Sequence, residues 1–518
     1  MLRIPNMLNC FARLTKTPTK RQPKLATTAL QTEALEQRQV LSVDSLYFSG
    51  SILVVHTDNT STSVEVRTVG SNVQIKEVGS NKVWNYAASS VGKVEFQGGN
   101  GNDRFVNYST TLPVRAFGGA GNDYLEGYDG ADVMVGGSGD DTLSGYGGND
   151  QLWGGDGNDL ILGGNGNDDL MGDAGNDQLN GRAGLDRLWG GYGDDVLVAI
   201  DNGTSDILQG DDGYDTLWVD QTGSARDTMA GNSTLDKVQA VASFANGADR
   251  TLDGDRLADP NGRITDSQGH VYGSLVKTFS DVPLFTSAGP QASDIVQGAC
   301  GDCYFLAGLG AIAQDNSRAI RQNIVDFNDG TYGVRLGNSF YRVDNDLPVN
   351  ASSDTTPSYA KLGRGGNYAM WVAIYEKAFA FYRSSAKTYN SIQGGWSVEV
   401  NRAFGSASAG EKNFNSYSSA AALANDVYNR FVNREAVTIG FFGSNMANNT
   451  PLVLGHMYLV TNVIRNASNV VTSIELRNPW GIDGGSVASG NPNDGIVSVT
   501  PAQLWNFNSI GRVNWGRV

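Results

Sequence analysis

The stretch GGDGNDLIL, residues 154–162, is one unit of a nine-residue repeat that fills the middle of the chain. An aspartate recurs every nine residues without interruption, and two residues after each aspartate stands an aliphatic residue. The aspartates are Asp123, Asp132, Asp141, Asp150, Asp159, Asp168, Asp177, Asp186 and Asp195. The aliphatic residues are Leu125, Met134, Leu143, Leu152, Ile161, Leu170, Leu179, Leu188 and Leu197. Such a fixed period predicts a solenoid in which every unit contributes one short strand.

Each unit divides into a glycine-rich turn and a strand. The first six residues offer backbone carbonyls and a carboxylate to a hard cation such as Ca²⁺, while the last three bury their central aliphatic residue. The array frays at its ends, because Asp103 precedes it and Asp206 and Asp215 follow after a two-residue slip. In two units Asp173 and Arg182 replace the second glycine. We expect these departures to weaken single sites without breaking the array.

The acidity of the chain is concentrated in this array. Residues 98–220 contain 23 Asp or Glu and four Arg or Lys, a net charge of −19, while the whole chain of 518 residues carries −16. Such a segment repels nucleic acid, so its natural partner is a cation. We expect it to fold only with Ca²⁺, because its charges repel one another and its glycines lose much entropy on folding. A calcium-free glycine-rich solenoid is the alternative.

With these features, residues 98–220 resemble the repeats-in-toxin (RTX) family, whose unit is GGxGxDxUx. The resemblance implies a parallel β-roll with Ca²⁺ between successive turns and with the nine repeated aspartates as calcium ligands. Two repeats form one turn in that family, so nine units imply about four to five turns.

Changes in composition divide the rest of the chain. We expect a basic leader, flexible or processed, over 1–44, a small β-rich element over 45–97, the roll over 98–220, a linker over 221–279 and a catalytic domain over 280–518. The segment LEQRQVLS at 35–42 is similar to a leader motif of large surface or secreted proteins. No run of 18 apolar residues occurs, so we expect no transmembrane helix.

A second decisive stretch is DIVQGACGDCYFLAGLGAI, residues 294–312. After Cys303 the apolar residues recur at helical spacing, and Asp302 stands where a helix N-cap belongs. Cys303 would then open the helix, where unpaired amides and the helix dipole favour a thiolate and lower the thiol pKa. With Cys10 and Cys300 the chain has three cysteines, too few for a disulfide scaffold.

A thiolate enzyme also needs a base and a group that orients it. His456 lies in LVLGHMYLVTNV, and Asn478 lies in ELRNPWG, with Trp480 able to screen the bond between them from water. The order Cys, His, Asn is typical of papain-like proteases. Alternatives for this region are a buried inert Cys303, a zinc or redox site at CxxC, and a reversible Cys300–Cys303 disulfide that silences the nucleophile.

Several separated motifs over about 280–518 are similar to the calpain family of cysteine proteases: QGACGDCYFL, GHMY, RNPWG, YRVDNDLP, WVAIYEKAFAFYR and DGIVSVTPAQLW. The resemblance implies a two-lobed papain-like fold. It also implies that Cys303 attacks a peptide carbonyl, His456 carries the proton and Asn478 orients His456. Gln297 and the backbone N–H of Cys303 would stabilise the oxyanion.

Calpains also bind calcium in the catalytic core, and this chain keeps part of those sites. Asp294 and the Gly289 carbonyl match one site, but Ala369 stands in place of the family's glutamate. Asp494 matches the second site, where Ile496 replaces another glutamate. We therefore expect the roll to be the main calcium element.

Together these features predict a multidomain protein, a parallel β-roll followed by an α+β papain-like cysteine protease domain. The expected function is a calcium-associated cysteine endopeptidase that acts on protein or peptide substrates outside the cell or at its surface. The roll would serve folding, export or surface attachment. The alternatives are a calcium-binding surface or adhesion protein with an inactive calpain-like module, and acyl transfer to an amine.

Overall fold

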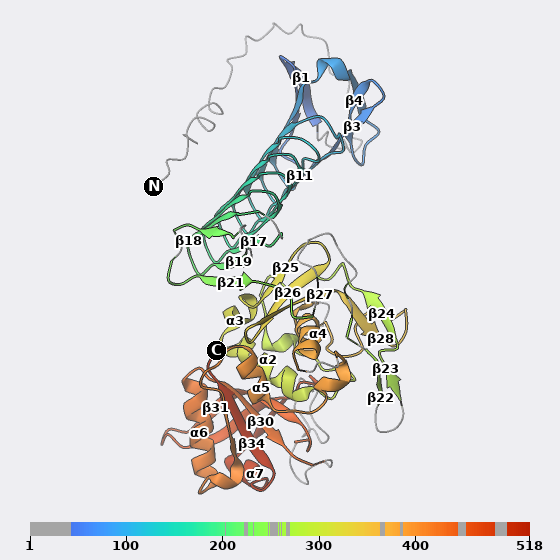
Figure 1. Ribbon diagram of the computed structural model, residues 1–518. Helices are drawn as coiled ribbons and strands as arrows, with labels where there is room; N and C mark the ends of the chain where they lie inside the picture. The colour runs from blue at the N-terminus through green and yellow to red at the C-terminus, as the bar shows by residue number, and fades with distance from the viewer. Residues whose placement is uncertain are drawn as a thin grey trace, which may run out of the picture. The chain divides into compact units, whose positions relative to one another are not determined.

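The structure is a computed structural model and describes residues 43–518 except 202–203, 222–225, 232, 247, 249–256, 258, 261, 266–269, 363–367, 384–386, 444–451 and 482–494. Its first part consists of two long sheets that face each other across one apolar core, and over residues 93–241 the chain passes alternately from one sheet to the other (Figure 1). The first sheet has the order β1 (Val43–Ser49), β2 (Ile52–Thr57), β6 (Lys93–Asn100), β8 (Val114–Ala120), β10 (Val133–Ser138), β12 (Gln151–Asp156), β14 (Asp169–Ala174), β16 (Arg187–Tyr192), β18 (Ile207–Asp212) and β20 (Thr228–Met229).

The second sheet has the order β21 (Lys237–Val241), β19 (Thr216–Asp220), β17 (Val196–Ala199), β15 (Gln178–Ala183), β13 (Leu160–Asn165), β11 (Thr142–Gly147), β9 (Tyr124–Glu126), β7 (Arg104–Asn107), β3 (Ser63–Val69), β4 (Asn72–Glu77) and β5 (Val83–Ala87). A short 3₁₀ helix, η1 (Ala88–Ser90), follows β5. The β-rich element before the repeats thus adds strands to the same two sheets, and roll strands continue to Val241, inside the range that the sequence analysis takes as linker.

The register of the strands confirms the parallel β-roll. Leu143 of β11 pairs with Ile161 of β13, two repeat units further along the chain, and the two strands are parallel. Two units therefore form one turn. All nine repeated aliphatic residues have no exposed surface, because each strand turns its second side chain into the core between the sheets.

The two glycine positions of a repeat unit require glycine for different structural reasons. At the first, Gly154, a Cβ atom would lie 2.1 Å from Oδ2 of Asp159, so only glycine leaves room for the aspartate. At the second, Gly155, φ is +115°, a backbone conformation that glycine adopts without strain. Five units place another residue there in the left-handed conformation: Tyr128, Tyr146, Asp173, Arg182 and Asp211. The array therefore tolerates more departures at the second glycine than the sequence analysis recognised.

The second part of the chain mixes helices with small sheets. Its strands form the pairs β22 (Ile264–Thr265) with β23 (Val271–Tyr272) and β24 (Leu275–Thr278) with β28 (Asp346–Val349), and the sheet β25 (Ile324–Asp326), β26 (Thr331–Leu336), β27 (Ser339–Asp344). A six-stranded sheet has the order β29 (Gly410–Asn413), β34 (Gly511–Gly516), β30 (Ala436–Phe441), β31 (Met457–Arg465), β32 (Val471–Arg477), β33 (Ile496–Val499). The helices are α2 (Cys303–Asp315), α3 (Ser317–Arg321), α4 (Trp371–Arg383), α5 (Ser397–Ala403), α6 (Ala420–Val432) and α7 (Pro501–Trp505), with 3₁₀ turns η2 (Ala292–Asp294), η3 (Tyr389–Ile392) and η4 (Phe414–Ser416).

Two cores hold this part together, as a two-lobed α+β fold requires. One core surrounds α2 and α4, and the other fills the space between the six-stranded sheet and α6 and α7 (Figure 1). Helix α2 packs directly on β31. At Gly310 of α2 a Cβ atom would lie 2.8 Å from the Leu459 side chain, so this glycine lets helix and strand approach. The same packing places Cys303, the first residue of α2, beside Met457, the first residue of β31.

The end of the roll contacts the sheet β25–β27. The side-chain amide of Gln178 donates to the Asp326 carbonyl at 2.7 Å, and that of Asn180 donates to the Phe327 carbonyl at 3.1 Å. The Trp218 ring meets the Phe327 ring edge-on, in a small apolar cluster shared by both parts. Among the described residues, no helix is long and apolar enough to span a membrane.

Candidate functional site

The loop before α2 is fixed by backbone pairing with a second loop. The Ala299 N–H donates to the Ser358 carbonyl and the Lys361 N–H to the Val296 carbonyl, both at 2.8 Å. At Gly298 a Cβ atom would lie 2.0 Å from the Tyr359 carbonyl oxygen. Only glycine allows this approach, so the QG pair of the sequence motif sets the path of the chain into α2.

Cys303 is the first residue of α2 and is partly exposed, whereas Cys300 is buried. The backbone N–H of Met457, at the start of β31, faces the Cys303 thiol. Since His456 precedes Met457 in the chain, the packing of α2 on β31 brings the cysteine and histidine motifs together. Both thiols are free in the structure, and the Cys300 Sγ lies 3.9 Å from the Tyr389 carbonyl oxygen. The regulatory disulfide therefore stays a hypothesis.

His456 is held by the RNPWG segment. Its Nε2 lies 2.7 Å from Oδ1 of Asn478, and Asn478 has no exposed surface. The same Oδ1 accepts the Trp480 backbone N–H at 3.0 Å. The Trp480 ring covers the imidazole, with ring centroids 4.4 Å apart. Because Asn478 occupies Nε2, the other ring nitrogen, Nδ1, is left for proton exchange.

Burial raises the pKa of Cys303 and lowers the pKa of His456. It raises the pKa of the Cys303 thiol to about 12, although the Met457 N–H opposes the shift. Burial also lowers the pKa of His456 to about 4, against the bond to Asn478. Burial therefore favours the neutral form of each group, the thiol and the imidazole. The expectation that the helix start lowers the thiol pKa is not met, because desolvation outweighs the backbone N–H groups of Met457, Tyr304 and Cys303 that face the thiol.

Gln297 stands near both lobes. Its backbone N–H donates to the Pro479 carbonyl at 2.8 Å, which ties the loop before α2 to the asparagine segment. Its side-chain amide donates to the Cys300 carbonyl at 2.5 Å and approaches Oδ1 of Asp302 at 3.4 Å. In this arrangement both N–H groups of the amide have partners within the protein.

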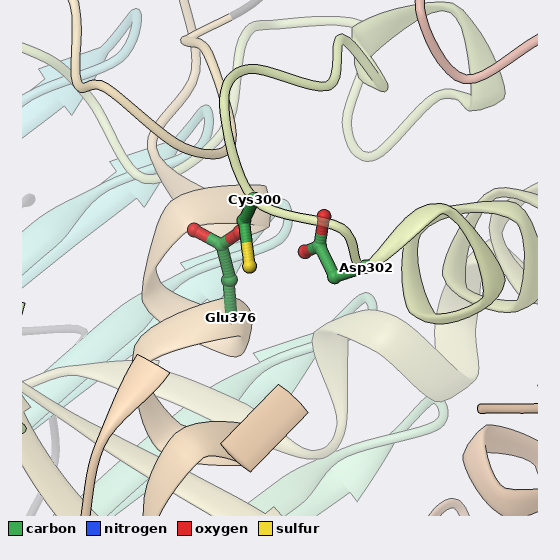
Figure 2. Close-up of side chains that lie close together, drawn as sticks. All are labelled: Cys300, Asp302 and Glu376. Carbon is green, nitrogen blue, oxygen red and sulfur yellow. The ribbon is translucent and has the colours of Figure 1, made fainter. Parts of the chain in front are cut away.

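Asp302 occupies the N-cap position of α2, but its side chain makes no capping hydrogen bond. The carboxyl turns inward instead, toward Cys300 and Glu376 of α4, and one ligand atom of each residue lies within 4.8 Å of the others (Figure 2). Asp302 is fully buried and Glu376 is 2% exposed. Burial raises the pKa of Asp302 to about 6, and burial followed by the charge of Asp302 raises that of Glu376 well above its usual range. The expected capping role of the Asp302 side chain is therefore wrong.

Asp294, a calcium ligand expected in the catalytic core, accepts two hydrogen bonds within the protein. Asp294 accepts the Trp371 indole N–H at 2.8 Å and the Gln291 backbone N–H at 2.9 Å through Oδ2. Asp494 is outside the described residues. Among the described residues, the group of three Cys, Asp or Glu side chains close enough to share an ion is Cys300, Asp302 and Glu376, without Asp294. A calcium role for Asp294 stays a prediction.

The repeated aspartates of the roll are all buried, with at most 2% of their surface exposed. Oδ1 of each accepts the backbone N–H of an aspartate or equivalent residue one turn earlier, as Asp159 does from Asp141 at 2.7 Å. Oδ2 of each has no hydrogen-bond donor among the described residues. This orphaned oxygen lies beside the backbone of the first repeat glycine. A row of buried carboxylate oxygens without donors fits Ca²⁺, which takes oxygen ligands.

Burial is also the largest cause that raises the pKa of these aspartates, to about 6 for Asp159, about 8 for Asp150 and about 9 for Asp186. A proton therefore competes with a cation at each site. The same chemistry extends to the frayed ends, where Oδ2 of Asp103, Asp206 and Asp215 also lacks a donor.

The sequence analysis did not identify Glu376 as part of this site. It lies in the motif WVAIYEKAFAFYR, where a helical pattern of apolar residues predicts that position 376 faces the core. A glutamate on a buried helical face is the signal that could have found it, because buried carboxyl groups need a partner.

Comparison with known proteins matches both parts. Residues 274–487 match the model of the calpain family cysteine protease. Four copies of the RTX calcium-binding nonapeptide repeat match residues 115–143, 135–170, 144–179 and 171–199. Calpain-9 of Homo sapiens is 26% identical over 226 residues, covering 40% of this chain and 31% of that protein. Calpain-9 of Mus musculus is 25% identical over 213 residues, covering 38% and 30%.

The chain spans about a third of the length of these curated relatives, 31% and 30%. The buried aspartates and the matched repeats agree on Ca²⁺ as the cofactor. The chain thus contains RTX calcium-binding repeats followed, over residues 274–487, by a calpain-family cysteine protease domain.

Proposed function

We propose that this protein is a calcium-associated cysteine endopeptidase that hydrolyses peptide bonds with Cys303 as nucleophile, His456 as base and acid, and Asn478 as the residue that orients His456. The observation that carries the proposal is the 2.7 Å contact between His456 Nε2 and Asn478 Oδ1, formed where β31 packs on the helix that begins with Cys303. This contact leaves Nδ1 of His456 for the thiol proton.

We propose that the reaction starts from a neutral thiol and a neutral imidazole, the forms that burial favours. The Cys303 Sγ attacks the peptide carbonyl carbon while its proton passes to His456, which becomes imidazolium. Asn478 keeps the ring in place and accepts from its Nε2–H. The imidazolium then gives the proton to the leaving amine as the C–N bond breaks. Water, deprotonated by the same imidazole, hydrolyses the thioester and restores Cys303.

The oxyanion of the tetrahedral intermediate needs N–H donors. The backbone N–H of Cys303, at the start of α2, is one candidate, because the first amides of a helix lack intrahelical partners. The Gln297 side chain is the second candidate. To serve, its amide must release the Cys300 carbonyl or Asp302, since both N–H groups are engaged in the resting structure.

The roll would bind Ca²⁺ through its repeated aspartates and neighbouring backbone carbonyls. Bound calcium neutralises the buried carboxylates that otherwise repel one another. We propose that the roll acts in folding, export or attachment at the cell surface, and that the protein works outside the cell. The dense row of raised carboxyl pKa values supports a structural use of calcium, because the sites form only when the turns stack.

Cleavage of casein by the full chain in millimolar calcium tests the proposal, with Cys303→Ala and His456→Ala as variants. We expect both variants to lose activity by about 10⁴-fold or more, as removal of a nucleophile or its base does in comparable enzymes. Cys300→Ala is the matched control, and we expect it to keep the activity. Equal cleavage by Cys303→Ala and wild type would exclude the proposed nucleophile. Incorporation of an added amine without casein cleavage would indicate acyl transfer instead.

A further inference from the structure

Two buried carboxyl groups lie directly behind the nucleophile, and the reaction above does not use them. Asp302 is the residue before Cys303, and Glu376 reaches it from α4 (Figure 2). Neither group has an ion pair with a described cation. Two adjacent carboxylates cannot both stay ionised in such a place, because each charge opposes the other and neither is solvated.

The hydrogen bonds around Asp302 and Glu376 indicate which of their carboxyl oxygens still lack a donor. The Ala360 backbone N–H donates to Glu376 Oε2 at 3.0 Å. Glu376 Oε1 and Asp302 Oδ2 are both buried without a donor among the described residues. One proton between the two carboxyls supplies both oxygens, one as donor and the other as acceptor. Asp302 Oδ1 remains to face the Gln297 amide at 3.4 Å.

We propose that Asp302 and Glu376 share one proton, and that this carboxyl pair is a positioning element that holds the Gln297 amide beside the nucleophile. The role of Gln297 rests on the proposed function, whereas the shared proton does not. Glu376 carries the proton and donates it to Asp302, and the single negative charge on Asp302 attracts the amide of Gln297. A second negative charge there would disfavour the Cys303 thiolate.

The pair is enclosed by few other titratable groups. Those that face it from α2, from the loop after β28, from η3 and from the loop before α2 are Cys300, Cys303, Tyr304, Tyr359, Lys361 and Tyr389. Lys361 is the cation in this set, and its amine donates to the Pro357 carbonyl. The proton is therefore expected to remain on the pair across the neutral pH range.

Glu376→Gln is the direct test, because a glutamine N–H can replace the carboxyl O–H toward Asp302 while its oxygen still accepts from Ala360. In the full chain with calcium, we expect Glu376→Gln to keep kcat/KM within about threefold of wild type and to leave the pH profile unchanged. Glu376→Leu, which has no donor, should lower kcat about tenfold or more with KM little changed, because the oxyanion donor is misplaced.

Infrared spectroscopy reads the proton without relying on activity. The difference spectrum of wild type minus Glu376→Gln should contain the carbonyl band of a buried carboxylic acid. Glu435→Gln, a partly exposed glutamate paired with Arg430, should show no such band. If wild type proved inactive, the proposed function would fail, but the infrared band would still decide whether the pair holds a proton.

Three results would overturn the inference. The first is absence of the carboxylic acid band from the difference spectrum. The second is loss of activity in a folded Glu376→Gln variant, which would mean that Glu376 must be ionised. The third is one zinc ion per wild-type chain by elemental analysis, absent from Glu376→Gln, which would make Cys300, Asp302 and Glu376 a metal site.

Discussion

The roll and the catalytic domain both bury carboxyl groups, but the partners of the carboxyl oxygens differ between the two regions. In the roll, each repeated aspartate keeps one oxygen on a backbone N–H and leaves the other without a donor, in a row along the turns. In the catalytic domain, Asp302 and Glu376 face each other as a pair. A row of single oxygens suits a cation, whereas a pair suits a proton. A buried carboxyl group therefore indicates a cation site when it stands alone and a shared proton when a second carboxyl group faces it.

The largest effect that separates the two regions is expected on removal of calcium. With calcium a thousandfold above Kd, each site contributes about 4 kcal/mol to folding. Excess chelator should therefore accelerate amide exchange in the strands of the roll by about a thousandfold, with a far smaller change in β30, β31 and β34. Hydrogen exchange followed by mass spectrometry measures both regions in one sample. Equal loss of protection in the roll and in β30, β31 and β34 would contradict the proposal that calcium stabilises mainly the roll.

A single carboxylate should have a smaller and local effect. Asp159 and Asp156 stand in the same repeat unit, but Asp159 is buried with an orphaned oxygen, whereas Asp156 is exposed. Asp159→Asn should lower the calcium bound by about one ion per chain, because a charged oxygen ligand is lost. Asp156→Asn makes the same change in charge and should leave the stoichiometry unchanged. Equilibrium dialysis with calcium analysis distinguishes the two variants.

The dependence on pH should have opposite signs with and without calcium. Because burial raises the pKa values of Asp159, Asp150 and Asp186 to about 6, 8 and 9, protons displace calcium as the pH falls through this range. The calcium concentration at half-saturation should rise about tenfold or more between pH 8 and pH 6.

In chelator, the folded roll binds more protons than the unfolded chain above pH 4, since unfolded Asp titrates at about 3.9. Its stability is therefore greatest at acid pH and is lost as the pH rises through the raised pKa values. Circular dichroism against pH, with calcium and with chelator, measures both trends. Parallel trends would contradict the account of the orphaned oxygens.

The smallest predicted effect concerns the contact between the two regions. Gln178 and Gln151 begin equivalent strands, but Gln178 donates to the Asp326 carbonyl and Gln151 is exposed. Gln178→Ala should lower the free energy of unfolding by about 1 kcal/mol, because one hydrogen bond is lost. Gln151→Ala should leave it unchanged. Thermal unfolding in calcium compares the two, and equal melting temperatures would indicate that the contact contributes nothing.

The sequence predicted the parts of the fold that depend on local patterns. The period of nine placed Leu143 and Ile161 in one core, because each repeat buries its own aliphatic residue. The cysteine, histidine and asparagine motifs identified Cys303, His456 and Asn478 as candidates, and the structure brings His456 and Asn478 into contact.

What the sequence could not predict depends on contacts between distant segments. Asp302 looked like an N-cap, but Glu376, which lies 74 residues later, draws its carboxyl inward. The helix start suggested a low thiol pKa for Cys303, but burial of the thiol raises that pKa, against the Met457 N–H. In the sequence Gln178 resembles any other strand residue, and only the fold brings the Asp326 carbonyl beside its side-chain amide. Patterns describe one segment, whereas desolvation and pairing require two.

The most direct test of the division between a calcium-binding roll and a thiol active site is the alkylation of cysteine by iodoacetamide, mapped by peptide mass spectrometry. The account predicts that Cys303 is alkylated while buried Cys300 is not, in calcium and soon after chelation. It also predicts that the rate at Cys303 falls in His456→Ala. Labelling of Cys300 in preference to Cys303, or a rate unaffected by His456→Ala, would contradict it.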